Sequence, residues 1–438
     1  MSMNTMKAPP AAPMGAATTA RQPRRYELDW LRVIVVLGLI PYHIAVVYAL
    51  GPGDYVKSPQ RSVAFDLLAT MAGFWGMPLL FLVAGAASWF ALGRREPRQY
   101  LLERVGRLAV PFACGVLLLV PIQLYVERLA TPGYNLNYLQ FYLTFLLGWL
   151  NIGEQGVFGH GMQYWGHLWF ILYLLAVAVF LLPLLLWLRR PRPQRWLARS
   201  VAWLASAPGL LLLLGAPLAI VEIGLQGPIG PTPATDYSNL YSGPAGLVLY
   251  AVAYVLGYII FAEPRLRQAI IGERQLALAL AIGLFVAHEL ILASSGASLA
   301  ASPLGALLIR LARAYITWFL LAAILGYAQR YLAADGRALR YLNEACFPIY
   351  VLHMPIMSAL AYFITRWPAP IIVTFPALVI ATTLGVFGVY EFAVRRVPAM
   401  RVIFGMKPRR VALDTLDTAE ARAERDNRQA HADLAAHS

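Results

Sequence analysis

Long runs of apolar residues recur along almost the whole chain, separated by short polar stretches that are rich in arginine. Each run is close to the ~20 residues that a helix needs to cross about 30 Å of hydrocarbon. The runs are unbroken and lack the apolar–polar alternation of strands in a membrane barrel. Because lipid offers no partner to an exposed backbone group, helices are the remaining solution. The pattern predicts an all-α membrane protein.

We expect about ten transmembrane helices. A further apolar segment, 138–150, is too short to span, and we expect it to form an interfacial or re-entrant helix. The membrane domain, 24–407, is flanked by a disordered tail at 1–23 and a charged tail at 408–438. The predicted spans are 30–50, 67–92, 105–126, 167–188, 200–223, 243–262, 275–293, 305–330, 344–364 and 370–394.

Composition agrees with this class, because 59% of the 438 residues are hydrophobic and only 13% are charged, against about 25% charged in soluble domains. The net charge of +14 does not indicate nucleic acid, because the basic residues gather in alternate loops. That asymmetry predicts a multi-pass membrane protein with both termini cytosolic. The two cysteines, Cys114 and Cys346, lie inside predicted spans. We therefore expect no disulfide framework and no metal site.

The first span carries three ionisable residues on one face, and such residues are costly in a membrane and mark functional sites. At about 100° per residue, Arg32 and His43 project within about 20° of each other, with Asp29 about 40° to the other side of His43. Asp29 and Arg32 can form an ion pair, whereas His43 lies about 16 Å further along the axis from Arg32. We expect the pair at the cytosolic mouth and the histidine near mid-membrane. The alternative is an ion pair and a core histidine that only position the helix.

Two other predicted spans bring histidines to similar depths. His353 lies about 14 Å along the ninth span, between Pro348 and Pro355. The seventh span contains His288 and Glu289, and the Glu289 carboxylate could orient a histidine. Because helix packing cannot be read from one sequence, these residues are candidate partners of His43.

Further candidates lie at the ends of the spans. Arg104 and Arg107, three residues apart at the start of the third span, suit a phosphate ligand because guanidinium binds phosphate in a bidentate fork. The alternative for them is ordinary anchoring at the cytosolic surface. His167 and Trp169 begin the fourth span at the other face, either as part of an aromatic belt or as a platform for a sugar ring.

These motifs resemble those of the membrane-bound acyltransferase-3 family. The resemblance rests on the Arg-x10-His of Arg32 and His43, the Arg-x2-Arg of Arg104 and Arg107, and the segments GHLWFILYLL and FPIYVLHMPI. The opening YELDWLRVIVVLGLIPYHIAVVY and the ending YEFAVRRVPAMRVIFGMKP resemble the branch that succinylates osmoregulated periplasmic glucans. Together the motifs cover roughly residues 25–407.

The resemblance implies transfer of an acyl group from cytosolic acyl-CoA, with succinyl-CoA favoured and acetyl-CoA as the alternative, to a hydroxyl of a periplasmic glucan or another envelope carbohydrate. It implies that His43 is catalytic and that Arg32, Arg104 and Arg107 contact the donor at the mouth that Asp29 shares. His43 would act as a general base. His353, Tyr42 or backbone amides near Pro41 would serve the oxyanion. A covalent acyl-histidine relay stays open.

Other functions also fit a helical bundle. One is a transporter of an envelope glycan, a lipid or an acyl carrier, and another is an O-acetyltransferase for a different envelope glycan. The buried polar groups gather at the mouth and mid-membrane and no internal repeat is visible, which favours a site over a transport pathway. Arg310 and Arg313, in the eighth span, are candidates to bind a succinyl carboxylate or the acceptor. A homo-oligomer is compatible with the sequence.

Overall fold

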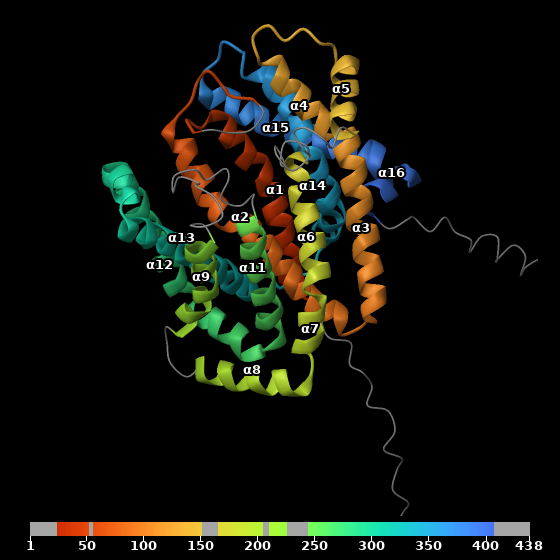
Figure 1. The fold of residues 1–438 in the computed structure, drawn as a ribbon. Coiled ribbons are helices and arrows are strands. Elements are labelled where there is room, and N and C mark those ends of the chain that lie inside the picture. The colour runs from red at the N-terminus through yellow and green to blue at the C-terminus, as the bar shows by residue number, and fades with distance from the viewer. Residues whose placement is uncertain (1–23, 52–55, 151–164, 205–209, 226–243, 407–438) are drawn as a thin grey trace, which may run out of the picture.

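The computed structural model describes residues 24–51, 56–150, 165–204, 210–225 and 244–406. Every element in these ranges is helical, which confirms the predicted class (Figure 1). In chain order the elements are α1 (Tyr26–Tyr48), α2 (Val63–Leu92), α3 (Pro97–Leu118), α4 (Val120–Leu129), α5 (Tyr138–Leu150), the 3-10 helix η1 (Gly166–Leu168), α6 (Trp169–Phe180), α7 (Leu182–Leu188), α8 (Pro191–Leu204), the 3-10 helix η2 (Leu210–Gly215), α9 (Ala216–Leu225), α11 (Pro244–Ala262), α12 (Pro264–Ala301), α13 (Pro303–Tyr331), α14 (Arg337–Ile364), α15 (Ile371–Val389), the π-helix η3 (Tyr390–Val394) and α16 (Pro398–Ile403). The predicted tails, 1–23 and 408–438, lie outside the described residues.

Seven helices of the described chain are long and apolar enough to cross a membrane. The count becomes eight if α6 and α7, bent by 50° at Leu181, form one span, as the predicted span 167–188 requires. Pro183 near the start of α7 accounts for the bend, because it cannot donate a helical hydrogen bond. Segment 138–150 forms α5, a helix too short to span, as its length predicts; its interfacial or re-entrant position stays a prediction.

The remaining two predicted spans are not among these candidates, because their described helices are shorter. Segment 200–223 is divided among α8, η2 and α9, with 205–209 outside the described residues. In Figure 1, α8 lies across one end of the bundle. The helix is amphipathic, because Arg192, Arg195 and Arg199 are exposed whereas Val201 is buried, and such a helix favours a surface position. The predicted span 243–262 forms α11, an apolar helix inside the bundle.

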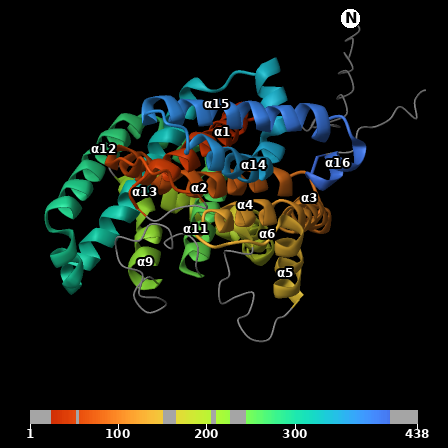
Figure 2. The same ribbon diagram turned by 90° about the horizontal axis from the view of Figure 1, so that it is seen from above.

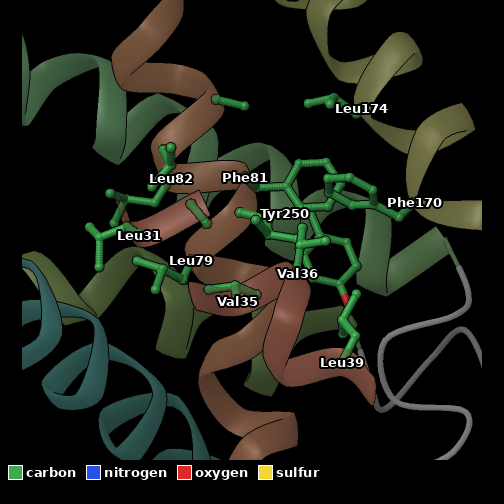
Figure 3. Close-up of a cluster of buried hydrophobic side chains, with 14 of the residues drawn as sticks. Leu31, Val35, Val36, Leu39, Leu79, Phe81, Leu82, Phe170, Leu174 and Tyr250 are labelled. Carbon is green, nitrogen blue, oxygen red and sulfur yellow. The ribbon is translucent and has the colours of Figure 1, made fainter. Parts of the chain in front are cut away.

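Helix α1 occupies the centre of the packing. It contacts α14, α2, α15 and α13, and Figure 2 shows it between α15 and α2. Figure 3 shows where its apolar face is buried: Val36 and Leu39 of α1 approach Phe81 of α2 and Tyr250 of α11. The Phe81 ring stacks on Tyr250 with centroids 4.5 Å apart. The first helix, which carries the candidate histidine, is therefore fixed from several sides.

Helices α2 and α11 approach each other until their backbones touch. A Cβ at Gly85 would lie 1.9 Å from the carbonyl oxygen of Tyr254, and a Cβ at Gly257 would lie 1.9 Å from that of Leu82. Small residues allow such an approach between membrane helices, where packing and not water exclusion drives association. The pair therefore forms a rigid unit beside α1.

We predict that Gly257→Ala lowers the free energy of unfolding by ~1–3 kcal/mol, as overpacking does in other tight contacts. The matched control is Gly76→Ala on α2, where an added Cβ meets nothing within 4 Å. Thermal unfolding of the detergent-solubilised variants measures both. Equal melting temperatures for the two variants would contradict the close contact.

Candidate active site

Arg32 is held by two helices at the end of the bundle where α1 and α14 begin. Its Nη1 donates to Asp29 Oδ1 at 3.4 Å and to Asn343 Oδ1 of α14 at 3.1 Å. Asp29 also accepts from Arg24, with Nη2 at 2.8 Å. The acidic residue sits in the first turn of α1, where the helix dipole favours negative charge. The predicted Asp29–Arg32 pair is confirmed, and Arg24 and Asn343 join it.

Arg104 is held by neutral hydroxyl groups. Its Nη2 donates to Ser88 Oγ at 3.1 Å. The Ser88 oxygen lies 2.9 Å from the Tyr100 hydroxyl and 2.6 Å from that of Tyr254, and all three residues are buried. Ser88 itself donates to the carbonyl of Ala84. This arginine is therefore oriented by groups that leave its charge available to an anion.

Arg107 lies near Arg32 at the end of the bundle where α1 and α14 begin, which is called the mouth from here on. Its charge interacts with those of Arg32 on α1 and of Arg104 and Arg95 nearby, with Glu103 as the opposing carboxylate. Glu103 forms an ion pair with Arg95 at 3.3 Å. Positive charge therefore predominates in this group of described side chains, because Arg24, Arg32, Arg95, Arg104 and Arg107 outnumber the carboxylates Asp29 and Glu103.

Three histidines meet further along the same helices. The His353 ring of α14 lies 5.3 Å from the His43 ring of α1 and 5.2 Å from the His167 ring of η1, between centroids. His353 is 1% exposed and His167 is 7% exposed. His353 was a predicted partner of His43, and the structure confirms that the two rings are in contact. Among the described residues, no such cluster has the arrangement of a metal site.

Hydrogen bonds to carbonyl groups fix two of these rings. His353 Nδ1 lies 2.6 Å from the carbonyl oxygen of Tyr350, and His167 Nε2 lies 3.0 Å from that of Val351. A carbonyl oxygen only accepts, so each of these nitrogens carries the proton. In its neutral form His353 then presents a lone pair on Nε2, and this buried atom has no hydrogen-bond partner among the described residues. Neutral His353 is an acceptor, which is the opposite of the oxyanion donor that was expected.

His167 is tied to α14 at two points. Besides its ring contact with Val351, its backbone carbonyl accepts a hydrogen bond from the Tyr350 hydroxyl. Trp169 follows directly and packs on Tyr250 and Tyr173, with ring centroids 5.4 and 5.3 Å away. The start of the fourth span is therefore part of the wall around the histidines.

Other predicted site residues lie on different helices. Glu289 Oε1 accepts a hydrogen bond from Nδ1 of its neighbour His288 on α12 at 2.9 Å, and that histidine packs on Phe74 of α2. Arg313 of α13 is 2% exposed, and its charge and that of Arg310 act on the buried Glu222 of α9. Neither pair lies on α1, α14 or η1, which carry the three histidines.

Several polar residues of the site and of the neighbouring helices were not predicted from the sequence. Glu222 had a signal, because a carboxylate within an apolar run is costly in a membrane. Asn343, Ser88 and Tyr254 carried none, since uncharged polar residues are common in helices and their contacts come from packing. Tyr350 is part of the motif FPIYVLHMPI but gave no indication of its bond to His167.

Comparison with known proteins identifies the family. The family model "Acyltransferase domain" (Acyl_transf_3) matches residues 25–391. "Glucans biosynthesis protein C" of Salmonella typhimurium and that of Salmonella typhi are each 24% identical over 204 residues, which is 46% of this chain and 49% of theirs. The chain thus spans about half the length of these curated relatives. No solved structure matches. With the match covering most of the chain, the protein belongs to the acyltransferase-3 family of membrane-bound acyltransferases.

Proposed function

We propose that this protein is a membrane O-acyltransferase that moves a succinyl group from cytosolic succinyl-CoA to hydroxyls of a periplasmic glucan. One observation carries the proposal: α1 and α3 gather Arg32, Arg104 and Arg107 at one mouth, and α1 leads from there to His43 in the histidine cluster. The arginines suit a polyanionic thioester donor, and the histidine suits the activation of a hydroxyl.

The donor side follows from the charge at the mouth. CoA carries several phosphate charges, and arginines with few opposing carboxylates suit them. The basic loops adjoining this end support a placement of both termini in the cytosol, where CoA is found, and we propose that the membrane is a bacterial inner membrane. The acceptor would then reach the histidines from the periplasmic side.

His43 acts as the general base in the proposed reaction. It takes the proton of the sugar hydroxyl as the hydroxyl oxygen attacks the thioester carbonyl. The tetrahedral intermediate then collapses, the carbon–sulfur bond breaks, and protonated His43 gives its proton to the leaving CoA thiolate, which restores the neutral base. Pro41 removes one helical hydrogen bond just before His43, which leaves a backbone carbonyl of α1 for another partner.

His353 supports His43 by accepting a hydrogen bond. Its Nε2 lone pair is fixed by the Nδ1 bond to Tyr350, and its ring lies against that of His43. Nε2 can therefore accept from the sugar hydroxyl or from the His43 ring and hold either one in place. His167 and Trp169 are proposed to bind the acceptor side, with Trp169 as the surface for a sugar ring.

The acyl group and the acceptor are proposed from the relatives and from the motifs of the sequence. The relatives are named for glucan biosynthesis, and the motifs at both ends of the chain resemble the glucan-succinylating branch. Acetyl transfer to another envelope glycan is the alternative. Arg310 and Arg313 remain proposed partners of a succinyl carboxylate, which would have to compete with Glu222 for them. Glu289 is proposed to contact the acceptor through His288.

His43→Ala is expected to lower the rate of acyl transfer ~10²–10⁴-fold, the usual contribution of a general base. Mass spectrometry of periplasmic glucan, from a deletion strain carrying wild type or the variant, measures the product. The mass of the ester also distinguishes succinyl from acetyl. Unaltered esterification by His43→Ala would refute the proposed chemistry, and unmodified glucan with wild type would refute the acceptor.

The acceptor role of His353 predicts a difference between two amide variants. The amide oxygen of His353→Gln can reach the position of Nε2, whereas that of His353→Asn cannot. We expect Gln to retain about ten-fold more activity than Asn, the value of roughly one hydrogen bond. Initial rates of acyl-CoA consumption by purified protein measure both. Higher activity of His353→Asn than of His353→Gln would place the important contact at Nδ1 and refute the acceptor role of Nε2.

The role of Arg104 predicts a loss that depends on the phosphates of the donor. Arg104→Gln should raise KM for succinyl-CoA by ~10–100-fold, since hydrogen bonds to charged groups contribute ~1.5–3 kcal/mol. KM for succinyl-pantetheine, which lacks the nucleotide phosphates, should change little. Arg98→Gln, at an exposed position near the start of α3, is the control. An equal rise with both donors would contradict phosphate binding.

A further inference from the structure

The segment Pro398–Met406, here the C-terminal arm, returns to the mouth after α15. Arg401 of this arm is 9% exposed. Its Nη2 donates to Glu344 Oε1 of α14 at 3.0 Å, and its Nη1 donates to the carbonyl of Arg395 at 3.3 Å. Both of these hydrogen bonds join Arg401 to other parts of the same chain. Arg401 therefore links two helices, whereas Arg104 has no carboxylate at hydrogen-bond distance in the described part of the chain.

The contact between Arg401 and Glu344 lies on α14 next to the residue that binds Arg32. Asn343, which accepts from the Arg32 side chain, directly precedes Glu344. On the same turn, the thiol of Cys346 donates to the backbone carbonyl of Arg32 at 3.7 Å. The first turns of α14 therefore link the C-terminal arm on one side to Arg32 on the other.

The end of the arm rests on α3 beside Arg107. Gly405 has φ +65°, a conformation that favours glycine. A Cβ at this position would lie 2.8 Å from the carbonyl oxygen of Arg107 and 3.1 Å from Pro111. Figures 1 and 2 show α16 beside α3 at the edge of the molecule. The arm thus contacts both helices that supply the arginines of the mouth.

We propose that the C-terminal arm is a clamp that sets the spacing of the donor-binding arginines, with Arg401 as its positioning residue. Through Glu344 and Asn343 it fixes Arg32 on α1, and through the turn at Gly405 it fixes Arg107 on α3. The inference rests on the proposed donor role of these arginines. It makes donor affinity depend on residues that do not touch the donor.

The first test measures the clamp without any donor. Cys114→Ser leaves Cys346 as the single thiol of the chain, and Cys346 is 4% exposed. In this background, Arg401→Gln should speed labelling of Cys346 by a small maleimide about ten-fold, because local opening exposes the first turns of α14. Arg396→Gln is the matched control, because Arg396 is exposed and its guanidinium lies over Phe392. Equal labelling of the two variants overturns the clamp.

The second test measures the link to the donor. Arg401→Gln and Glu344→Gln should each raise KM for succinyl-CoA about ten-fold with kcat within about two-fold, and the double variant should be no worse than either, as for two residues in one interaction. Arg401→Lys should recover part of the affinity. Gly405→Ala, which leaves every charge in place, should also raise KM. Unchanged KM, or a loss confined to kcat, overturns the positioning role.

The two tests separate this inference from the proposed function. Wild-type protein without acyl transfer refutes the proposed function, and the labelling comparison then decides on the clamp alone. Normal transfer by wild type together with equal labelling of the two variants refutes the clamp and leaves the proposed function standing.

Discussion

The contact between α1 and α14 is the interaction on which the rest of the site depends. Polar groups inside a membrane are costly unless a neighbouring helix satisfies them, and α14 does so at both ends of the polar face of α1. At the mouth, Asn343 accepts from Arg32, and deeper in the bundle the ring of His353 lies against that of His43. Helix α14 also holds His167 through Tyr350 and Val351. One helix therefore organises both halves of the site.

The membrane class, most of the helical spans and the residues of α1 could be predicted because each depends on local pattern. The length of apolar runs decides which segments span, and helical periodicity alone places Asp29, Arg32 and His43 on one face. The motif around His353 was also readable, since prolines and an ionisable residue in an apolar run are unusual. These features need no knowledge of the neighbouring helix.

What could not be predicted depends on packing between distant segments. The hydroxyl groups that hold Arg104 come from α2, α3 and α11, and Ser88 and Tyr254 look like ordinary residues of apolar helices. The expected oxyanion donor His353 is an acceptor in its neutral form because of one carbonyl in the preceding turn. The single span expected at 200–223 is divided, because the arginines of α8 favour a surface position over a buried one.

The backbone contact between α2 and α11 has a consequence for how a donor enters. Ser88 and Tyr254, which hold Arg104, lie on these two helices, and the glycine contact leaves them no room to slide. That wall of the mouth is therefore stationary. Arg107 lies one turn further along α3 from Arg104, and there the chain at Gly405 approaches its carbonyl oxygen. The mouth thus has two kinds of support: one is built into the bundle, and the other is a short segment whose sequence can change while the bundle stays intact.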